Sequence, residues 1–103
     1  MRFALIGCGR ISPNHIVAAR NNGMQIAALC DLKEDHIQDK VLKFELGDEV
    51  KHYLDYKEML ETEQPDLVAV ATESGKHASI ALDCIRAGCH VIIEKPIALS
   101  LKD

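Results

Sequence analysis

A glycine turn close to the N-terminus carries the clearest chemical signal in this chain. Gly7, Cys8 and Gly9 directly follow an apolar run at residues 3–6 and lead into a helical pattern. Gly7 permits a tight turn out of a strand, and Gly9 has no Cβ, so a pyrophosphate can approach the backbone closely. Asp31 ends the next apolar run about 20 residues later, where a carboxylate binds the ribose of a dinucleotide. This spacing predicts a strand, a glycine turn and a helix that together bind a dinucleotide.

The third position of the glycine turn departs from the usual pattern. Ser12 stands where glycine or alanine is usual, so the first helix is expected slightly further from the strand. Ser12 is also a good N-cap, with Pro13 at the first helical position, where its missing N–H costs little. The simpler interpretation is a strand, turn and helix without a ligand, and the position of Asp31 argues against it.

The acid at residue 31 also predicts which dinucleotide is bound. A carboxylate accepts hydrogen bonds from both ribose hydroxyls of NAD and repels the 2′-phosphate of NADP. No arginine directly follows Asp31, and Lys33 is the nearest cation, which would weaken the preference. We therefore expect NAD as the cofactor, with NADP less favoured.

Two polar segments follow predicted strands at the edge of the sheet where ligands of open α/β folds bind. Glu94, Lys95 and Pro96 follow the fifth strand, and a lysine there can donate to a substrate hydroxyl or help to move its proton. The segment from Thr72 to His77 follows the fourth strand, with hydroxyls and an imidazole that can contact a cofactor or a substrate. Taken alone, each segment is better explained as an exposed loop.

Tyr53 and Lys57 have the Tyr-x-x-x-Lys spacing of short-chain dehydrogenases. Those enzymes carry the pair on a helix after the fifth strand and use a Gly-x-x-x-Gly-x-Gly turn, which this sequence lacks. Tyr53 is therefore expected at the end of an edge strand rather than in a catalytic pair.

Composition limits the other functions of the chain. Its 103 residues make one domain, with a net charge of −4 and 4% aromatic residues, so we expect no nucleic-acid partner. No apolar run approaches the ~20 residues of a membrane helix, and the chain opens directly into a strand, which predicts a cytoplasmic protein without membrane association. The four cysteines form no Cys-x-x-Cys pair and the five histidines lack a ligand spacing, so we expect reduced thiols and no metal site.

Strand and helix patterns alternate along the whole chain, which is typical of a doubly wound α/β fold of Rossmann type. Continuous apolar runs predict parallel strands that are covered on both faces. The expected strands are 2–6, 25–30, 50–53, 67–71 and 90–94, and the expected helices are 13–22, 34–46, 55–64 and 76–87. Right-handed crossovers give the strand order 3-2-1-4-5, with about five strands and truncation before a sixth.

Local signals in the helices predict their ends and their packing faces. The second helix should run almost to Gly47, and the third should begin at Asp55, an acid suited to an N-cap. In the fourth helix, Ala78, Leu82 and Ile85 lie on one apolar face, which is expected to pack on the sheet.

Four segments of the chain resemble the family of glucose–fructose oxidoreductase, inositol dehydrogenase and MocA (Gfo/Idh/MocA). They are Gly7-Cys8-Gly9-Arg10-Ile11 with His15, Tyr53-Leu54-Asp55-Tyr56, Thr72-Glu73-Ser74-Gly75-Lys76-His77 and His90-Val91-Ile92-Ile93-Glu94-Lys95-Pro96. The resemblance spans about residues 1–101 and implies an NAD(P)-dependent oxidoreductase acting on sugars, inositols, sugar nucleotides and related compounds. It also implies a second α/β domain that holds a proton-transfer histidine.

The resemblance implies a role for each site residue. Lys95 would be the catalytic lysine that contacts the substrate, and Glu94 would lie beside the nicotinamide. The cofactor site as a whole would comprise Gly7, Gly9, Arg10, Ile11, Asp31, Thr72, His77 and Glu94. Glu73 replaces a proline that is usual in the family, which leaves the shape of that loop open.

The same resemblance implies how the whole enzyme is organised. Residues 1–103 would form the NAD(P)-binding domain of a longer homo-oligomeric enzyme with a small sugar-type substrate, and alone would hold cofactor without turnover. The segment from Gly9 to His15 is most similar to members acting on nucleotide-linked amino sugars, such as UDP-N-acetylglucosamine-derived uronates. Two alternatives stay open: a non-enzymatic nucleotide-binding regulatory module, and a relative of homoserine dehydrogenase or dihydrodipicolinate reductase, against which Glu94-Lys95-Pro96 argues.

Overall fold

The computed structural model describes residues 1–8, 12–71 and 77–93 of the chain. Within them, parallel strands alternate with helices along the sequence. The strands are β1 (Arg2–Ile6), β2 (Gln25–Cys30), β3 (Lys51–Tyr53), β4 (Leu67–Val70) and β5 (His90–Ile93), and the helices are α1 (Ser12–Asn21), α2 (Glu34–Lys43), α3 (Tyr56–Glu63) and α4 (His77–Arg86). The strands pair in the order β3-β2-β1-β4-β5, which confirms the predicted doubly wound Rossmann-type sheet.

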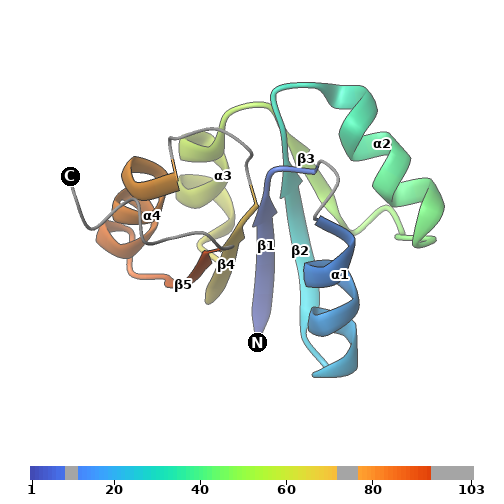
Figure 1. The fold of residues 1–103 in the computed structure, drawn as a ribbon, viewed down its shortest axis with the longest axis horizontal. Coiled ribbons are helices and arrows are strands. Elements are labelled where there is room, and N and C mark those ends of the chain that lie inside the picture. Colours follow the sequence, from blue (N-terminus) through green and yellow to red (C-terminus); the bar gives the residue numbers. More distant parts are fainter. Residues whose placement is uncertain (9–11, 72–76, 94–103) are drawn as a thin grey trace.

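The helices cover both faces of the sheet, so the described residues form three layers (Figure 1). Side chains on β1 alternate between the two faces, as the period of a strand requires. Phe3 and Leu5 belong to the core beneath α1 and α2, whereas Ala4 and Ile6 belong to the core beneath α3 and α4. β1 therefore contributes to both hydrophobic cores and lies at the centre of the sheet.

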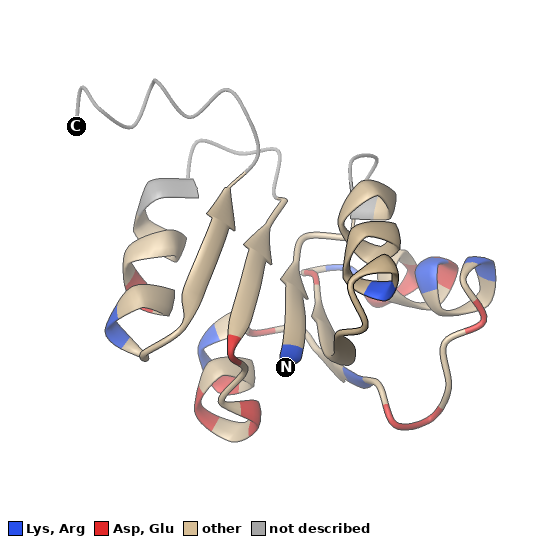
Figure 2. Ribbon diagram, turned by 90° about the horizontal axis from the view of Figure 1, so that it is seen from below, with Lys and Arg blue, Asp and Glu red and all other residues tan. Residues whose placement is uncertain are grey.

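Burial along the strands follows their position in the sheet. Every residue of β4 is buried, because β1 and β5 flank it and helices cover both faces. β3 and β5 form the two edges of the described sheet and are only partly buried, which confirms the predicted edge position of Tyr53. Figure 2 shows that charged residues gather on the helices and connections, while the strands are almost free of them.

The end of α2 differs from the prediction. The helix ends at Lys43, and Glu45 adopts a left-handed conformation with φ 52°. The N–H of Leu46 donates to the carbonyl of Val41 at 2.9 Å, and the N–H of Glu45 donates to Leu42 at 3.4 Å. This is a Schellman ending, in which glycine usually takes the left-handed position. The sequence pointed to Gly47 instead because a glutamate gives no such signal.

The predicted packing face of α4 is wrong. Leu82 and Ile85 are 51% and 58% exposed, whereas Ile80, Ala81 and Cys84 are buried against the sheet. Apolar residues occur almost all round this helix, so helical spacing alone selects no single face. The exposed pair leaves an apolar surface on the outer side of α4.

α3 begins where its sequence predicts. Asp55 is the N-cap in an extended conformation, and its Oδ1 accepts a hydrogen bond from the N–H of Lys57 at 2.9 Å. The cap satisfies one of the N–H groups that a helix start leaves without a partner. This cap fixes the chain between the end of β3 and the helix that packs on β2 and β3.

Candidate cofactor site

The carboxyl ends of the central strands are held level with one another. The N–H of Gly7 donates to Cys30 at 2.7 Å, that of Ala71 donates to Ile6 at 2.8 Å, and that of Asp31 donates to Tyr53 at 3.1 Å. The order of the strands reverses between β1 and β4, because β2 and β3 lie to one side of β1 and β4 and β5 to the other. A crevice at such a switch point binds ligands in open α/β folds. The turns after β1, β2 and β4 are therefore brought to one edge of the sheet.

The first glycine of the turn adopts the conformation that its position requires. Gly7 has a φ of 98°, a region that other residues reach only with strain. It directs the chain sharply away from the end of β1 and places the N–H of Cys8 beside the end of β2. A side chain at residue 7 would oppose this turn.

Cys8 is a packing residue in this turn. It is buried, and its thiol donates to the carbonyl of Cys30 at 3.6 Å. Burial above all, followed by the nearby carboxylate of Asp31, raises the pKa of Cys8 to about 12. Burial likewise raises the pKa of Cys30 to about 12. Both thiols are therefore protonated at neutral pH, which suits apolar filling and not nucleophilic chemistry.

The carboxylate of Asp31 is fixed by two backbone donors. Its Oδ2 accepts from the N–H of Cys8 at 2.8 Å, and its Oδ1 accepts from the N–H of Lys33 at 2.9 Å. The side chain is 14% exposed, so the acid lies at the surface of the crevice with a defined orientation. A carboxylate beside a glycine turn is suited to the hydroxyls of a ribose whose phosphates approach that turn.

The structure adds a residue that the sequence interpretation missed. His36, in the first turn of α2, places its Nδ1 3.4 Å from Oδ2 of Asp31, and its side chain is 44% exposed. The two residues are only five positions apart, but the short turn after β2 must fold back to bring them together. The available signal for this contact in the sequence is Asp31 itself. Aspartate side chains often bond the N–H two residues further along the chain, as Asp31 does with Lys33, and this turn brings the start of α2 back to the acid.

Most of the other predicted site residues lie outside the described part of the chain. Gly7 and Asp31 are brought together as expected, and His77 is the first residue of α4, with its side chain not described. The residues outside the described ranges are Gly9, Arg10, Ile11, Thr72, Glu94 and Lys95. Their roles stay predictions.

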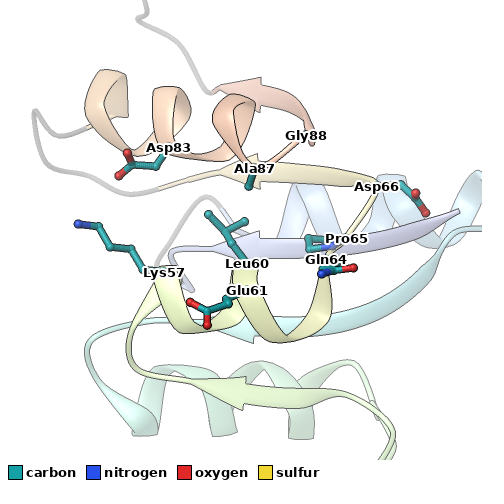
Figure 3. A pocket seen from close by; sticks show the side chains of 9 residues that line it. All are labelled: Lys57, Leu60, Glu61, Gln64, Pro65, Asp66, Asp83, Ala87 and Gly88. Carbon is teal, nitrogen blue, oxygen red and sulfur yellow. The ribbon is translucent and has the colours of Figure 1, made fainter.

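A groove of about 660 Å³ lies elsewhere, between α3 and α4 (Figure 3). Asp66 and Gly88, which precede β4 and β5, place it at the amino ends of the strands. Ligands of open α/β sheets bind at the carboxyl ends, so this groove is not the cofactor site. Its lining is mixed and charged, with side chains from Lys57, Leu60, Glu61, Gln64, Pro65, Asp66, Asp83 and Ala87.

The described residues show neither a metal site nor a membrane-spanning helix. Among them, no group of three histidine, cysteine or acidic side chains is placed to hold a metal ion. No helix in the same ranges is both long and apolar enough to cross a membrane.

Comparison with known proteins identifies the family. Residues 1–103 match the Gfo/Idh/MocA family, described as an oxidoreductase family with an NAD-binding Rossmann fold. The chain belongs to the Gfo/Idh/MocA oxidoreductase family. This confirms the resemblance seen in the glycine turn and strand ends, and NAD is the cofactor of this Gfo/Idh/MocA domain.

Two of the relatives of this Gfo/Idh/MocA domain are sugar-type dehydrogenases. It is 39% identical over 101 residues to D-apiose dehydrogenase of Paraburkholderia graminis, covering 97% of this chain and 26% of that protein. It is 36% identical over 107 residues to myo-inositol 2-dehydrogenase of Thermotoga maritima, covering 100% of this chain and 30% of that enzyme. The chain therefore spans less than a third of the length of these relatives.

A solved structure supports both the fold and the cofactor. The WlbA dehydrogenase of Bordetella pertussis, solved in complex with NADH and UDP-GlcNAcA, matches with a TM-score of 0.81 and 34% identity. The match covers 92% of this chain and 28% of that one. The Gfo/Idh/MocA domain thus shares its architecture with a dehydrogenase observed with bound NADH.

Proposed function

We propose that this chain supplies the cofactor-binding part of a dehydrogenase that transfers hydride between nicotinamide and a hydroxyl-bearing carbon of a sugar, an inositol or a sugar nucleotide. The observation that carries the proposal is the carboxylate of Asp31, held against the glycine turn by the N–H of Cys8. Family membership and the sugar-type names of the relatives support the substrate class. A substrate-binding domain beyond residues 1–103 completes the proposed catalyst.

The described residues fit a dinucleotide. Gly7 turns the chain away from β1, and α1 begins directly beyond the glycine turn, so its free N–H groups suit an anionic pyrophosphate. Asp31 presents an oriented carboxylate to ribose hydroxyls. NAD, when bound, supplies the hydride acceptor or donor. The chain's own task is to fix the dinucleotide in one orientation and so place the nicotinamide against the substrate.

The remaining roles in the proposal follow the family motif. Lys95 donates to the substrate hydroxyl and helps to move its proton, since an ammonium lowers the cost of negative charge developing on that oxygen. Glu94 lies beside the nicotinamide, and Arg10, Ile11, Thr72 and His77 complete the cofactor site. Gly9 leaves room for the pyrophosphate to approach the backbone. Within the sugar class, we favour nucleotide-linked amino sugars, because the WlbA likeness agrees with the sequence of the turn.

NADH is expected to bind this chain more tightly than NADPH. The carboxylate of Asp31 accepts from ribose hydroxyls and repels a 2′-phosphate, while the exposed Lys33 offsets only part of that repulsion. Isothermal titration calorimetry of the 103-residue chain with each dinucleotide at pH 8 measures the two dissociation constants. Equal affinities, or tighter binding of NADPH, would show that Asp31 does not select the cofactor.

We also propose that the protein is cytoplasmic and a homo-oligomer. Free, buried cysteines agree with a reducing compartment. At the edge strand β5, Ile92 is 44% exposed and is level with Ala69, on the face of the sheet opposite α4. A second copy can pair with this edge and cover Ile92.

Light scattering of the chain is expected to give a mass above that of the 11.4 kDa monomer at moderate concentration. Ile92→Lys should shift the mass towards the monomer, since a charge at an edge strand opposes pairing. Thr62→Lys, a charged substitution on α3, serves as the control. A monomeric wild-type chain would contradict the proposed self-association.

A further inference from the structure

We infer that His36 is a specificity-determining residue, which competes with the adenosine ribose for Asp31 and makes dinucleotide binding depend on pH. The inference rests on the proposed function, because it concerns the same cofactor site. His36 belongs to α2 and lies outside the family motifs that define the glycine turn and strand ends. Its imidazole contacts Oδ2 of the acid, whereas the N–H of Lys33 contacts Oδ1.

The argument begins with the hydrogen-bonding capacity of Asp31. A carboxylate offers about four lone-pair positions, two on each oxygen. The N–H of Cys8 and Nδ1 of His36 both lie against Oδ2, at 2.8 and 3.4 Å, and the N–H of Lys33 lies against Oδ1 at 2.9 Å. Only about one position is left for a ribose that brings two hydroxyls. Binding of both hydroxyls therefore requires His36 to leave the carboxylate.

Of the three donors, His36 is the one that can leave. The N–H groups of Cys8 and Lys33 belong to the backbone of the turns and are fixed by the ladder around them. The His36 contact is the longest of the three, and its side chain is 44% exposed, so the ring can turn into solvent. His36 is thus a partly exposed donor that occupies a hydrogen-bonding position of Asp31 needed by the ribose.

The charge on His36 decides how strongly it competes. Histidine is the side chain whose charge changes between pH 5 and pH 8. A neutral ring donates through Nδ1 in only one of its tautomers, whereas an imidazolium always carries that proton and forms a charge-assisted bond to Asp31. Protonation therefore strengthens the His36–Asp31 contact and weakens NADH binding. For NADPH, the same positive charge faces the 2′-phosphate and offsets the repulsion by Asp31.

Most of the other charged groups near His36 are paired with a partner that can carry the opposite charge. On α2, Asp39 is hydrogen-bonded to the buried Lys40 at 2.8 Å, and that bond above all holds the pKa of Asp39 below its usual range. His36 makes a smaller contribution to the same shift, so Asp39 lies within electrostatic reach of the ring. At the start of α2, Glu34 is paired with His52 of β3 at 3.0 Å. Lys33, with an exposed side chain, is the nearby cation on the connection from β2.

The test compares NADH binding at pH 8 and pH 5.5 in the 103-residue chain, by calorimetry, for the wild type and His36→Asn. The control is His52→Asn, because His52 is a second histidine with a carboxylate partner that makes no contact with Asp31. We expect the dissociation constant for NADH to rise about fivefold at pH 5.5 in the wild type and in the control, and to stay constant in His36→Asn. Circular dichroism confirms folding, and His36→Ala is a second variant for the same comparison.

NADPH provides a second readout. Its 2′-phosphate changes charge near pH 6, which affects the wild type and the variant alike, so the difference between them isolates His36. We expect the ratio of the NADPH to the NADH dissociation constant to fall between pH 8 and pH 5.5, and to fall by a larger factor in the wild type than in His36→Asn.

The outcomes separate this inference from the function on which it rests. NADH binding with the same pH dependence in the wild type and in both His36 variants would overturn the role of His36 and leave the proposed function intact. Absence of NADH binding at pH 8 in the wild type would overturn the proposed function, and the role of His36 with it.

Discussion

Replacing Lys95 with alanine in the full-length dehydrogenase is expected to lower kcat about 100-fold or more, with little change in NADH affinity. The proposed ammonium interacts with the substrate oxygen while charge develops on it, so its loss raises the energy of the transition state more than that of the bound cofactor. Steady-state kinetics with a sugar-type substrate measure kcat, and calorimetry with NADH measures binding.

The matched control for Lys95→Ala is Lys57→Ala. Lys57 is an exposed lysine in the first turn of α3 and lines the groove between α3 and α4. Replacing Lys57 also tests the Tyr-x-x-x-Lys alternative. If Tyr53 and Lys57 were a catalytic pair, the Lys57→Ala enzyme would lose its activity. Tyr53 donates to Glu63 in the structure, as expected of a packing residue at the sheet edge. Full activity of Lys95→Ala, or a large loss in Lys57→Ala, would contradict the proposed assignment.

Replacing Asp31 with alanine is expected to weaken NADH binding about 100-fold and to abolish the preference over NADPH. The substitution removes the charge-assisted bonds between the carboxylate and the ribose, each worth about 1.5–3 kcal/mol. It also removes the acceptor of the Cys8 N–H, which anchors the glycine turn to the end of β2. NADPH binding should fall less, because the repulsion of its 2′-phosphate disappears with the acid.

Calorimetry of the chain with both dinucleotides measures this effect. Asp35→Ala is the control, because it removes one negative charge from an exposed position four residues further on, at the start of α2. Asp31→Asn separates the two contributions, since it keeps the shape of the side chain and removes its charge. Unchanged NADH affinity in Asp31→Ala would exclude a ribose contact.

The sequence predicted the sheet because its strand signals are strong and independent of one another. β4 is apolar on both faces, as a central parallel strand requires, and the edge position of the polar strand β3 followed from the same reasoning. The family motif and the spacing from Gly7 to Asp31 then predicted where the cofactor binds. Each of these inferences depends on a short segment, and the residues within that segment are enough to indicate its structure.

The features that sequence could not predict depend on packing between segments. α4 is apolar around most of its surface, so the face on which Ile80 and Cys84 lie was decided by the fit to β4 and β5. α2 ends early because Glu45 takes a conformation for which glutamate gives no signal. His36 became a candidate only once the turn after β2 placed it beside Asp31.

The central position of β1 sets the order in which this chain can fold. β1 is synthesised first, and its partner on one side, β2, follows closely. Its partner on the other side is β4, where Phe3 pairs with Leu67, so that side stays open until most of the chain has been made. Contacts between distant segments form late, because a long loop must close first. We therefore expect a growing chain to pair β1, β2 and β3 before β4, which leaves an apolar edge that a chaperone can shield.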